Sequence, residues 1–235
     1  MALGTPVQLT TGATSTIATT YTDVTASITP TANALILVDI WASSNAGGTT
    51  TVVSVTGCGL TWVQDSTTAV SGGKRLRRWR SMGASPTTGP LSVTFSADQK
   101  QFIWHVVEIS GCDISGTNGS GAFAQASVTP TPTSATSIDA TISPTAANNA
   151  IVGVFEDDSG TTMNPDTGYT NLTKQTGLNQ SFVQYDLTPS GEPQTTCGAS
   201  SSGSGLKFCI ASEIKAAATG IPAGVLAAIL EDEGD

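Results

Sequence analysis

The chain has 235 residues, and its 38% of hydrophobic residues can supply the core of one large domain or two small ones. Only 11% of the residues are charged, against ~25% in typical soluble domains. The net charge of −9 and a pI near 4.3 argue against a general nucleic-acid-binding protein, which is normally basic. The sequence has no signal-peptide pattern and no apolar run near ~20 residues, so we expect synthesis in a cytoplasm and no membrane partner.

Short apolar segments alternate with turns rich in Gly, Ser, Thr, Pro and Asn, and no segment of helical period precedes the last fifteen residues. This pattern predicts an all-β chain. The first series of expected strands covers residues 23–29, 34–42, 51–55, 61–66, 75–81, 91–96 and 102–110. The second series covers residues 137–143, 150–156, 169–175, 182–187, 194–197 and 207–214.

The two series repeat one another. The segment VTASITPTANALILVDIW matches IDATISPTAANNAIVGVF, with Asn33-Ala34 against Asn149-Ala150, and HVVEISG matches IASEIKA. We therefore expect an internal duplication, with repeats at about 20–112 and 135–216 inside a β-sandwich of residues 1–217. Two arrangements are open: two tandem seven-stranded sandwiches, or one jelly-roll-like antiparallel sandwich whose interleaved halves share a core. We favour the interleaved sandwich, because the second half has shorter segments and the polar sequence GASSSGSGLK.

The segments outside the repeats are a connector and a tail. Residues 115–137 are rich in Gly, Pro, Ser and Thr, which predicts an extended crossover. Residues 218–235 form a tail in which Pro222 can open a short helix. Its apolar stripe consists of Val225, Leu226, Ile229 and Leu230, and its acidic end of Glu231, Asp232, Glu233 and Asp235.

The motifs TANALIL, GLTWV, RLRRWR, GPLSVTFS and WHVVEISG resemble a family of β-sandwich proteins of tailed bacteriophages and prophages, some of them capsid-decorating or tail-associated. The resemblance spans roughly residues 20 to 215. It implies a virion protein made in the host bacterial cytoplasm. Because these motifs are structural, the resemblance implies no catalytic residue.

Candidate catalytic and metal-binding groups are sparse. The only histidine, His105, lies in the apolar strand FIWHVVEI, where we expect a packed, hydrogen-bonded core residue and no catalytic triad. We predict no enzyme and no cofactor, since no phosphate-binding loop, nucleophile elbow or zinc motif occurs. The four cysteines are Cys58, Cys112, Cys197 and Cys209; their disulfide state stays open, with Cys197 and Cys209 as the favoured pair.

Two sets of acidic residues are candidates for special roles. Glu156, Asp157, Asp158 and Asp166 could offer oxygen ligands to Ca²⁺, but their spacing fits no EF-hand, and we expect a solvated strand end and no metal. Glu108 and Glu213 occupy matching places in the two repeats. We expect them to close each repeat through hydrogen bonds to a neighbouring loop.

The basic residues concentrate in one segment: Lys74, Arg75, Arg77, Arg78 and Arg80 are five of the nine Lys and Arg residues. On a strand they project to both sides, which predicts either a solvated edge strand protected by charge or a surface that meets an acidic partner. Nucleic acid is the least favoured partner, because the rest of the chain repels phosphates. We hypothesise that the tail of one copy docks on a neighbouring chain, its acidic end towards the basic segment of that chain.

These observations predict a non-enzymatic virion structural protein that binds other copies of itself and a phage shell or tail protein. The alternative is a carbohydrate- or receptor-binding module of a phage tail or bacterial surface, in which exposed Trp41, Trp62 and Tyr169 stack on sugars. Whether the protein belongs to the head or the tail, and how many copies assemble, stays open.

Overall fold

The computed structural model describes residues 2–15, 18, 21–44, 52–70, 73–95, 100–130, 133–176, 179–187 and 196–218. These residues form sixteen strands and one short 3-10 helix, Ser120–Ala122, and all strand pairs are antiparallel. The all-β prediction is confirmed. The predicted C-terminal helix lies outside the described residues. In the described part of the chain, no helix has the length and apolar character needed to cross a membrane.

Eight strands belong to each half of the chain. The first module is made of β1 (Val7–Thr14), β2 (Tyr21–Val24), β3 (Leu35–Ser43), β4 (Val52–Gly57), β5 (Val63–Val70), β6 (Lys74–Ser81), β7 (Leu91–Phe95) and β8 (Gln101–Ile109). The second module is made of β9 (Phe123–Pro130), β10 (Ala135–Thr141), β11 (Ala150–Asp157), β12 (Met163–Pro165), β13 (Thr170–Gln175), β14 (Gln180–Asp186), β15 (Thr196–Gly205) and β16 (Lys207–Ile214).

The two modules have the same sheet topology. The first has a five-stranded sheet of order β1-β8-β3-β6-β5 and a three-stranded sheet β2-β7-β4. The second has a five-stranded sheet whose order, starting from the β9 edge, is β9-β16-β11-β14-β13. Its three-stranded sheet has the order β10-β15-β12. In each module the first strand pairs with the last, the second with the seventh and the third with the sixth, which is jelly-roll pairing. The structure therefore shows the duplication that the sequence predicts.

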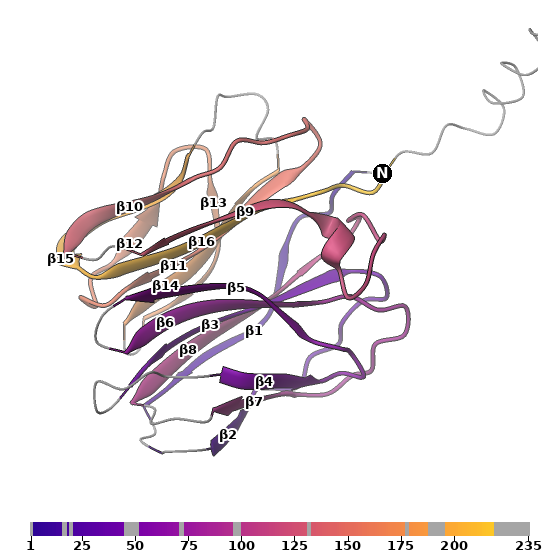
Figure 1. Cartoon of the computed structure of the whole chain (residues 1–235), viewed down its shortest axis with the longest axis horizontal. Coiled ribbons are helices and arrows are strands. Elements are labelled where there is room, and N and C mark those ends of the chain that lie inside the picture. Colours follow the sequence, from indigo (N-terminus) through magenta and orange to yellow (C-terminus); the bar gives the residue numbers. More distant parts are fainter. Residues whose placement is uncertain are drawn as a thin grey trace, which may run out of the picture.

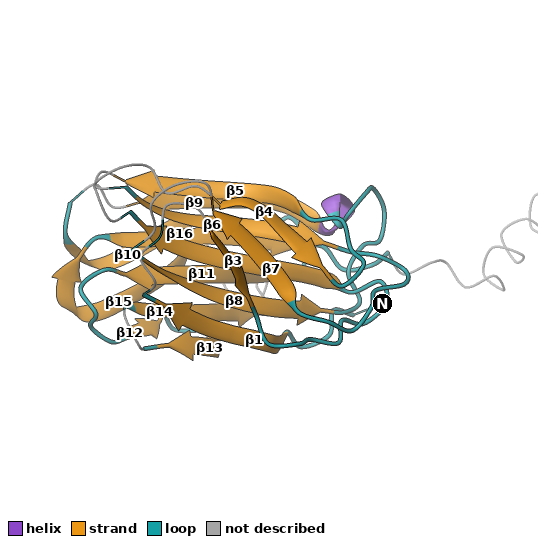
Figure 2. Cartoon of the chain, turned by 90° about the horizontal axis from the view of Figure 1, so that it is seen from below, coloured by secondary structure: helices purple, strands orange, loops and turns teal. Residues whose placement is uncertain are grey.

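The favoured interleaved sandwich is wrong, because every sheet takes all its strands from one half of the chain. The halves are two tandem jelly rolls stacked as four layers, which Figure 1 shows from the side; Figure 2 looks from below onto the faces of the stacked sheets and shows their strands running roughly along one another. The two five-stranded sheets form the inner layers, with β1 packed over β13 and β5 over β9. This order relates the modules by an approximate twofold axis.

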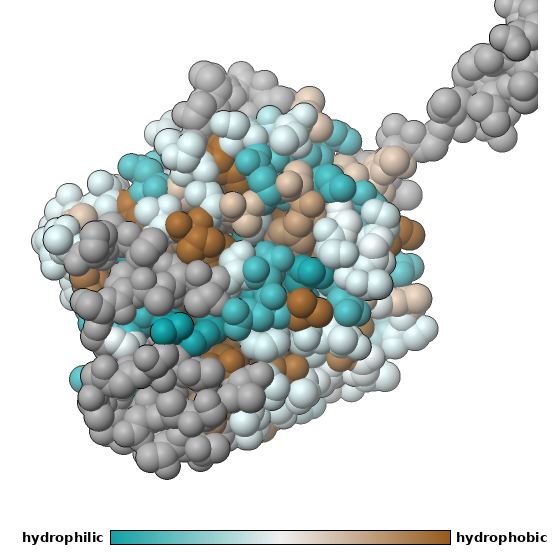
Figure 3. All heavy atoms as spheres, in the orientation of Figure 1, coloured by the Kyte–Doolittle hydropathy of each residue, from teal (hydrophilic) through white to brown (hydrophobic). Residues whose placement is uncertain are grey.

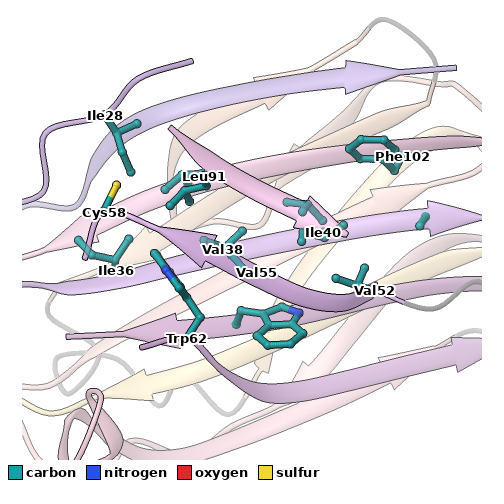
Figure 4. Packing of buried hydrophobic residues seen from close by; sticks show 14 of the residues in the cluster. Ile28, Ile36, Val38, Ile40, Val52, Val55, Cys58, Trp62, Leu91 and Phe102 are labelled. Carbon is teal, nitrogen blue, oxygen red and sulfur yellow. The ribbon is translucent and has the colours of Figure 1, made fainter. Parts of the chain in front are cut away.

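Three apolar clusters hold the layers together. One lies between the sheets of the first module and includes Val38, Leu91 and Phe102 (Figure 4), and another fills the second module around Phe155 and Phe182. The third lies between the modules and draws residues from both, among them Leu37 and Ile210. All residues of β3, β11 and β16 are buried because both faces of their sheets are covered.

Three strands, β1, β9 and the short β12, were not predicted from the sequence. β1 (VQLTTGAT) and β9 lie outside the predicted repeats, and β9 lies inside the expected connector. Both are edge strands whose ladders run along β8 and β16, and neither has a clear apolar alternation. The strand expected to end at residue 197 continues through GASSSGSG as β15; Cys197 and Ala199 face the core, and Gly198 and Gly203 lie so close to neighbouring side chains that a Cβ would clash there.

Each module is closed by a glutamate on its last strand. Glu108 accepts hydrogen bonds from the backbone N–H of Thr31 (2.6 Å) and its Oγ1 (2.7 Å). Glu213 accepts the same two bonds from Thr145, at 2.6 and 2.9 Å. The prediction that these glutamates bind a neighbouring loop is confirmed.

The register of the glutamates corrects the sequence alignment of the repeats. Glu108 lies opposite Ile36, and Glu213 lies opposite Ile151, so these two isoleucines are structurally equivalent. The alignment through Asn33-Ala34 instead matches Ile151 to Leu35. The second module carries one extra residue between its threonine and its isoleucine, and a one-residue slip exchanges the two faces of a strand.

Candidate functional site

The basic segment forms β6, which lies inside the five-stranded sheet between β3 and β5 rather than at an edge. Its side chains alternate between the two faces. Trp79 packs in the first module's core, and Leu76 packs in the cluster between the modules. By the same alternation Arg78 faces the second module and Arg77 faces the first module's core.

Arg78 is a buried link between the modules. Its guanidinium binds the Asp39 carboxylate through two hydrogen bonds, Nε to Oδ1 at 2.7 Å and Nη2 to Oδ2 at 2.9 Å. Its Nη1 donates to the Val152 carbonyl oxygen (3.2 Å) and to Ser212 Oγ (2.9 Å), both in the second module. The Arg78 and Asp39 side chains are 0% and 1% exposed.

The electrostatics of this pair follow from burial and proximity. Burial is the largest influence on the pKa of Arg78 and lowers it, but the charge and hydrogen bonds of Asp39 outweigh burial and leave that pKa raised. The pKa of Asp39 is also raised, because desolvation there exceeds the effect of Arg78. The bidentate geometry is that of an ionised pair, so we treat both groups as charged.

Two other cations of β6 also bind within the chain. Lys74 pairs with Asp158, which follows β11 in the second module. Arg80 binds Asp65 at 3.1 Å and donates to the Asn118 carbonyl oxygen at 2.7 Å, and its guanidinium lies 5.7 Å from the Phe123 ring centroid. In Figure 3, hydrophilic residues gather across the middle of the molecule, at the height of β5 and β6 in Figure 1.

This placement limits the predicted docking surface. Arg77 and Arg78 are 3% and 0% exposed, so neither can lie on a surface that binds another chain. Burial, and secondarily the charge of Arg75, lower the pKa of Arg77 to about 10. For the partly exposed Lys74, Arg75 and Arg80, partner binding stays a prediction. The tail residues Val225 to Asp235 lie outside the described residues.

His105 makes a further polar contact between the modules. It is 1% exposed; its Nε2 lies 2.9 Å from Ser181 Oγ of the second module, and its Nδ1 lies 3.1 Å from Thr11 Oγ1. Since Ser181 Oγ donates to the Phe155 carbonyl oxygen (3.0 Å), it accepts its bond from Nε2–H. Burial lowers the pKa of His105 to about 3, so the ring is neutral. The prediction of a packed, hydrogen-bonded histidine is confirmed, although it lies between modules and not in one module's core.

Glu156 is another polar group at the interface. It is 0% exposed, and neither of its carboxyl oxygens makes a hydrogen bond. Burial, the largest influence, raises its pKa well above the ordinary value. The expectation of a solvated acidic strand end is wrong here.

The other three residues considered as Ca²⁺ ligands, Asp157, Asp158 and Asp166, have separate contacts. Asp157 binds Lys207 Nζ at 2.7 Å, with both side chains 0% exposed, and Asp158 pairs with Lys74. Asp166 lies near Asp139. Within the described ranges, no three His, Cys, Asp or Glu side chains form a group suited to a metal ion.

The four cysteines and the aromatic residues complete the sequence-predicted sites. All four thiols are buried and free, including the favoured pair Cys197 and Cys209. Trp41, Trp62 and Tyr169 are 1%, 9% and 8% exposed. The expectation that these three aromatics stand exposed for sugar stacking is therefore wrong, because they pack in the apolar clusters.

Sequence reasoning missed Asp39, the counter-charge of Arg78. A signal was available, because an acidic residue inside the apolar run LILVDIW is rarely buried without a partner. The arrangement as a whole joins two modules through paired polar groups inside an apolar contact. Comparison with protein-family models, curated proteins and solved structures gives no match.

Proposed function

We propose that the chain is a non-enzymatic structural protein of a bacteriophage particle, which decorates or stabilises the capsid or tail through contacts with other copies and with a shell or tail protein. The resemblance of its strand motifs to phage β-sandwich proteins supports this proposal. The observation that carries it is the buried junction in which Arg78 joins Asp39 of its own module to Ser212 of the other.

A junction of this kind suits a building block. The apolar cluster between the modules excludes water, and the paired polar groups admit only one relative position of the two sheets. The two jelly rolls can therefore act as one rigid body that transmits load between neighbours on a particle. A protein that works by closing two domains around a ligand would instead need a smaller and more polar interface.

The outer surface fits attachment by shape more than by charge. The outermost sheet of the first module carries threonines on its outer face, such as the exposed Thr22 and the partly exposed Thr94, whose hydroxyls lie 3.0 Å apart across β2 and β7. Such a surface binds a partner through complementary contour and neutral hydrogen bonds. Because the net charge of the chain is −9, this surface also has no general attraction for nucleic acid.

The test is to purify particles of the phage or prophage that encodes the chain and to quantify the chain in them by mass spectrometry. We expect a fixed copy number per particle, and particles that lack the gene product should lose density in electron micrographs or withstand heat less well. Deletion of residues 221–235 should leave the modules folded and reduce particle attachment. If the chain were found in the cell lysate but not in the purified particles, the proposal would be contradicted.

A further inference from the structure

Among the described residues of the face that joins the modules, Glu156 has a buried carboxyl group without a counter-charge or a hydrogen bond. We propose that Glu156 is a proton-dependent lock between the modules: they pack tightly while its carboxyl carries a proton and loosen when that proton leaves to solvent. This inference concerns a conformational device and does not depend on the proposed function.

The position of Glu156 follows from the alternation of β11. Val152 and Val154, on the same face, belong to the cluster between the modules. Glu156 lies opposite Ser181 of β14 and Phe208 of β16, and the Phe208 ring packs edge-on against Trp41 of the first module, with centroids 6.4 Å apart. The carboxyl group therefore points into the contact between the modules.

The surroundings do not solvate a carboxylate. Both oxygens lack a hydrogen bond, as do Trp41 Nε1, Ser43 Oγ and Asn179 Nδ2, which are buried on neighbouring strand ends. Asn179 and Ser181 lie near enough to lower the pKa of Glu156 somewhat, but neither reaches hydrogen-bonding geometry with it. A protonated carboxyl tolerates such a site far better than a carboxylate, since an unpaired buried charge is much more costly than a neutral polar group.

The ionisable groups of the second module oppose the charged form. On its own strand and just after it, Asp157 and Asp158 raise the pKa of Glu156 further. The ladder partner β14 has no Lys, Arg or His between residues 180 and 186, and its Asp186 lies at the far end, opposite Ile151. On β16, Lys207 is bound to Asp157.

Among the described residues of the first module, the ionisable groups that β3, β6 and β8 direct towards this face are neutral or already paired. On β8, His105 is neutral and bound to Ser181. On β3 and β6, Asp39 and Arg78 neutralise each other. Lys74, at the start of β6, is paired with Asp158.

The direction of the pH effect follows from these contacts. Burial first, and then the two aspartates, hold the pKa of Glu156 in the folded chain well above its ordinary value of 4.5. Between these two pKa values the folded chain binds a proton that the unfolded chain has released, so stability falls as pH rises. Below the ordinary pKa Glu156 contributes no pH dependence, and above the folded-state pKa its penalty is constant.

The experiment compares urea unfolding of the full chain and of Glu156→Gln from pH 5 to pH 9. The ratio of the variant's folding constant to that of the natural chain should grow about tenfold per pH unit across the window and then level off. The pH dependence that comes from all other ionisable groups is the same in both chains and cancels in this ratio. A ratio that does not change with pH would overturn the proposal.

Hydrogen exchange tests the loosening itself. Above the transition, peptides of β3, β11 and β14 should exchange faster in the natural chain than in Glu156→Gln at the same pH, and equal rates would overturn the lock. Glu213→Gln is the matched control and should not slow exchange at high pH, because Glu213 has four hydrogen-bond contacts from Thr145, Asn149 and Gln125. If Glu156→Gln does not fold, Glu156→Leu replaces it. Carboxyl ¹³C NMR of the natural chain gives a reading without a variant, and a set of glutamates that all titrate at or below 4.5 would also overturn the proposal.

Discussion

The two modules share a fold but differ at the face on which they meet. Counting from the equivalent isoleucines Ile36 and Ile151, and through the strand ladders, six polar residues of this face have an apolar equivalent in the other module. The equivalent pairs are Asp39 and Val154, Arg78 and Val183, His105 and Ile210, Leu76 and Ser181, Val107 and Ser212, and Trp41 and Glu156.

These exchanges are matched across the interface. Arg78 meets Ser212, whereas their equivalents Val183 and Val107 both belong to the apolar cluster. In the same way His105 meets Ser181, and Ile210 and Leu76 are both in the cluster. The duplication therefore preserved the backbone while the faces became complementary. Two copies of one module could not form this interface, because Arg78 would then face Val107.

The largest expected effect comes from breaking the buried ion pair between Asp39 and Arg78 in the first module. Asp39→Ala leaves the Arg78 guanidinium buried without its counter-charge and should reduce the free energy of unfolding by about 3–5 kcal/mol, measured by urea denaturation. The double variant Asp39→Val with Arg78→Val copies the second module's Val154 and Val183. It should recover most of that loss, and a double variant as unstable as Asp39→Ala alone would refute the comparison.

A smaller effect is expected at Glu108 and Glu213, the glutamates that close the two modules. They test a feature that the modules share. Glu213 accepts bonds from Thr145, Asn149 and Gln125, whereas Glu108 binds Thr31. Glu213→Ala should therefore destabilise more than Glu108→Ala, by about 1.5–3 kcal/mol, the contribution of one hydrogen bond to a charged group. Thermal unfolding of the two variants measures the difference, and equal losses would contradict the hydrogen-bond count.

The pH dependence of this effect has a definite sign. Burial, the largest influence, raises the pKa of Glu213, but the bonds from Asn149, Thr145 and Gln125 together leave it lowered. The stabilisation is therefore present above the ordinary pKa of 4.5 and is lost as pH falls through the folded-state value. The penalty of Glu213→Ala should shrink in acid.

The smallest effect is expected at His105. The pair His105→Ile with Ser181→Leu copies Ile210 and Leu76 and should change the free energy of unfolding by no more than about 1–2 kcal/mol at neutral pH. In the natural chain, stability should fall as pH drops from 6.5 towards 3, because the unfolded chain binds a proton that the buried ring refuses. The double variant should lose that part of the acid sensitivity in urea titrations, and an unchanged acid profile would show that His105 is not its source.

The sequence was sufficient to predict the all-β fold and the duplication, because turn residues and matching strands are local signals. It also contained an unused signal for stacked modules: the runs LILVDIW and IVGVF are apolar on successive positions, which indicates sheets covered on both faces. The strands β1 and β9 could not be predicted in this way, since edge strands take their place from the ladder they join. The interface pairs could not be predicted because a one-residue insertion shifted the apparent alignment and hid which positions face each other.

The central claim is that the two jelly rolls behave as one unit through their polar and apolar junction. Native-state hydrogen exchange of the full chain, followed by mass spectrometry with increasing urea at a pH where Glu156 is still protonated, tests this most directly. The account predicts that peptides of β3, β8, β11 and β16 share one opening free energy, equal to that of global unfolding. If the peptides of β11 and β16 opened at a clearly lower free energy than those of β3 and β8, the modules would be independent and the claim would be wrong.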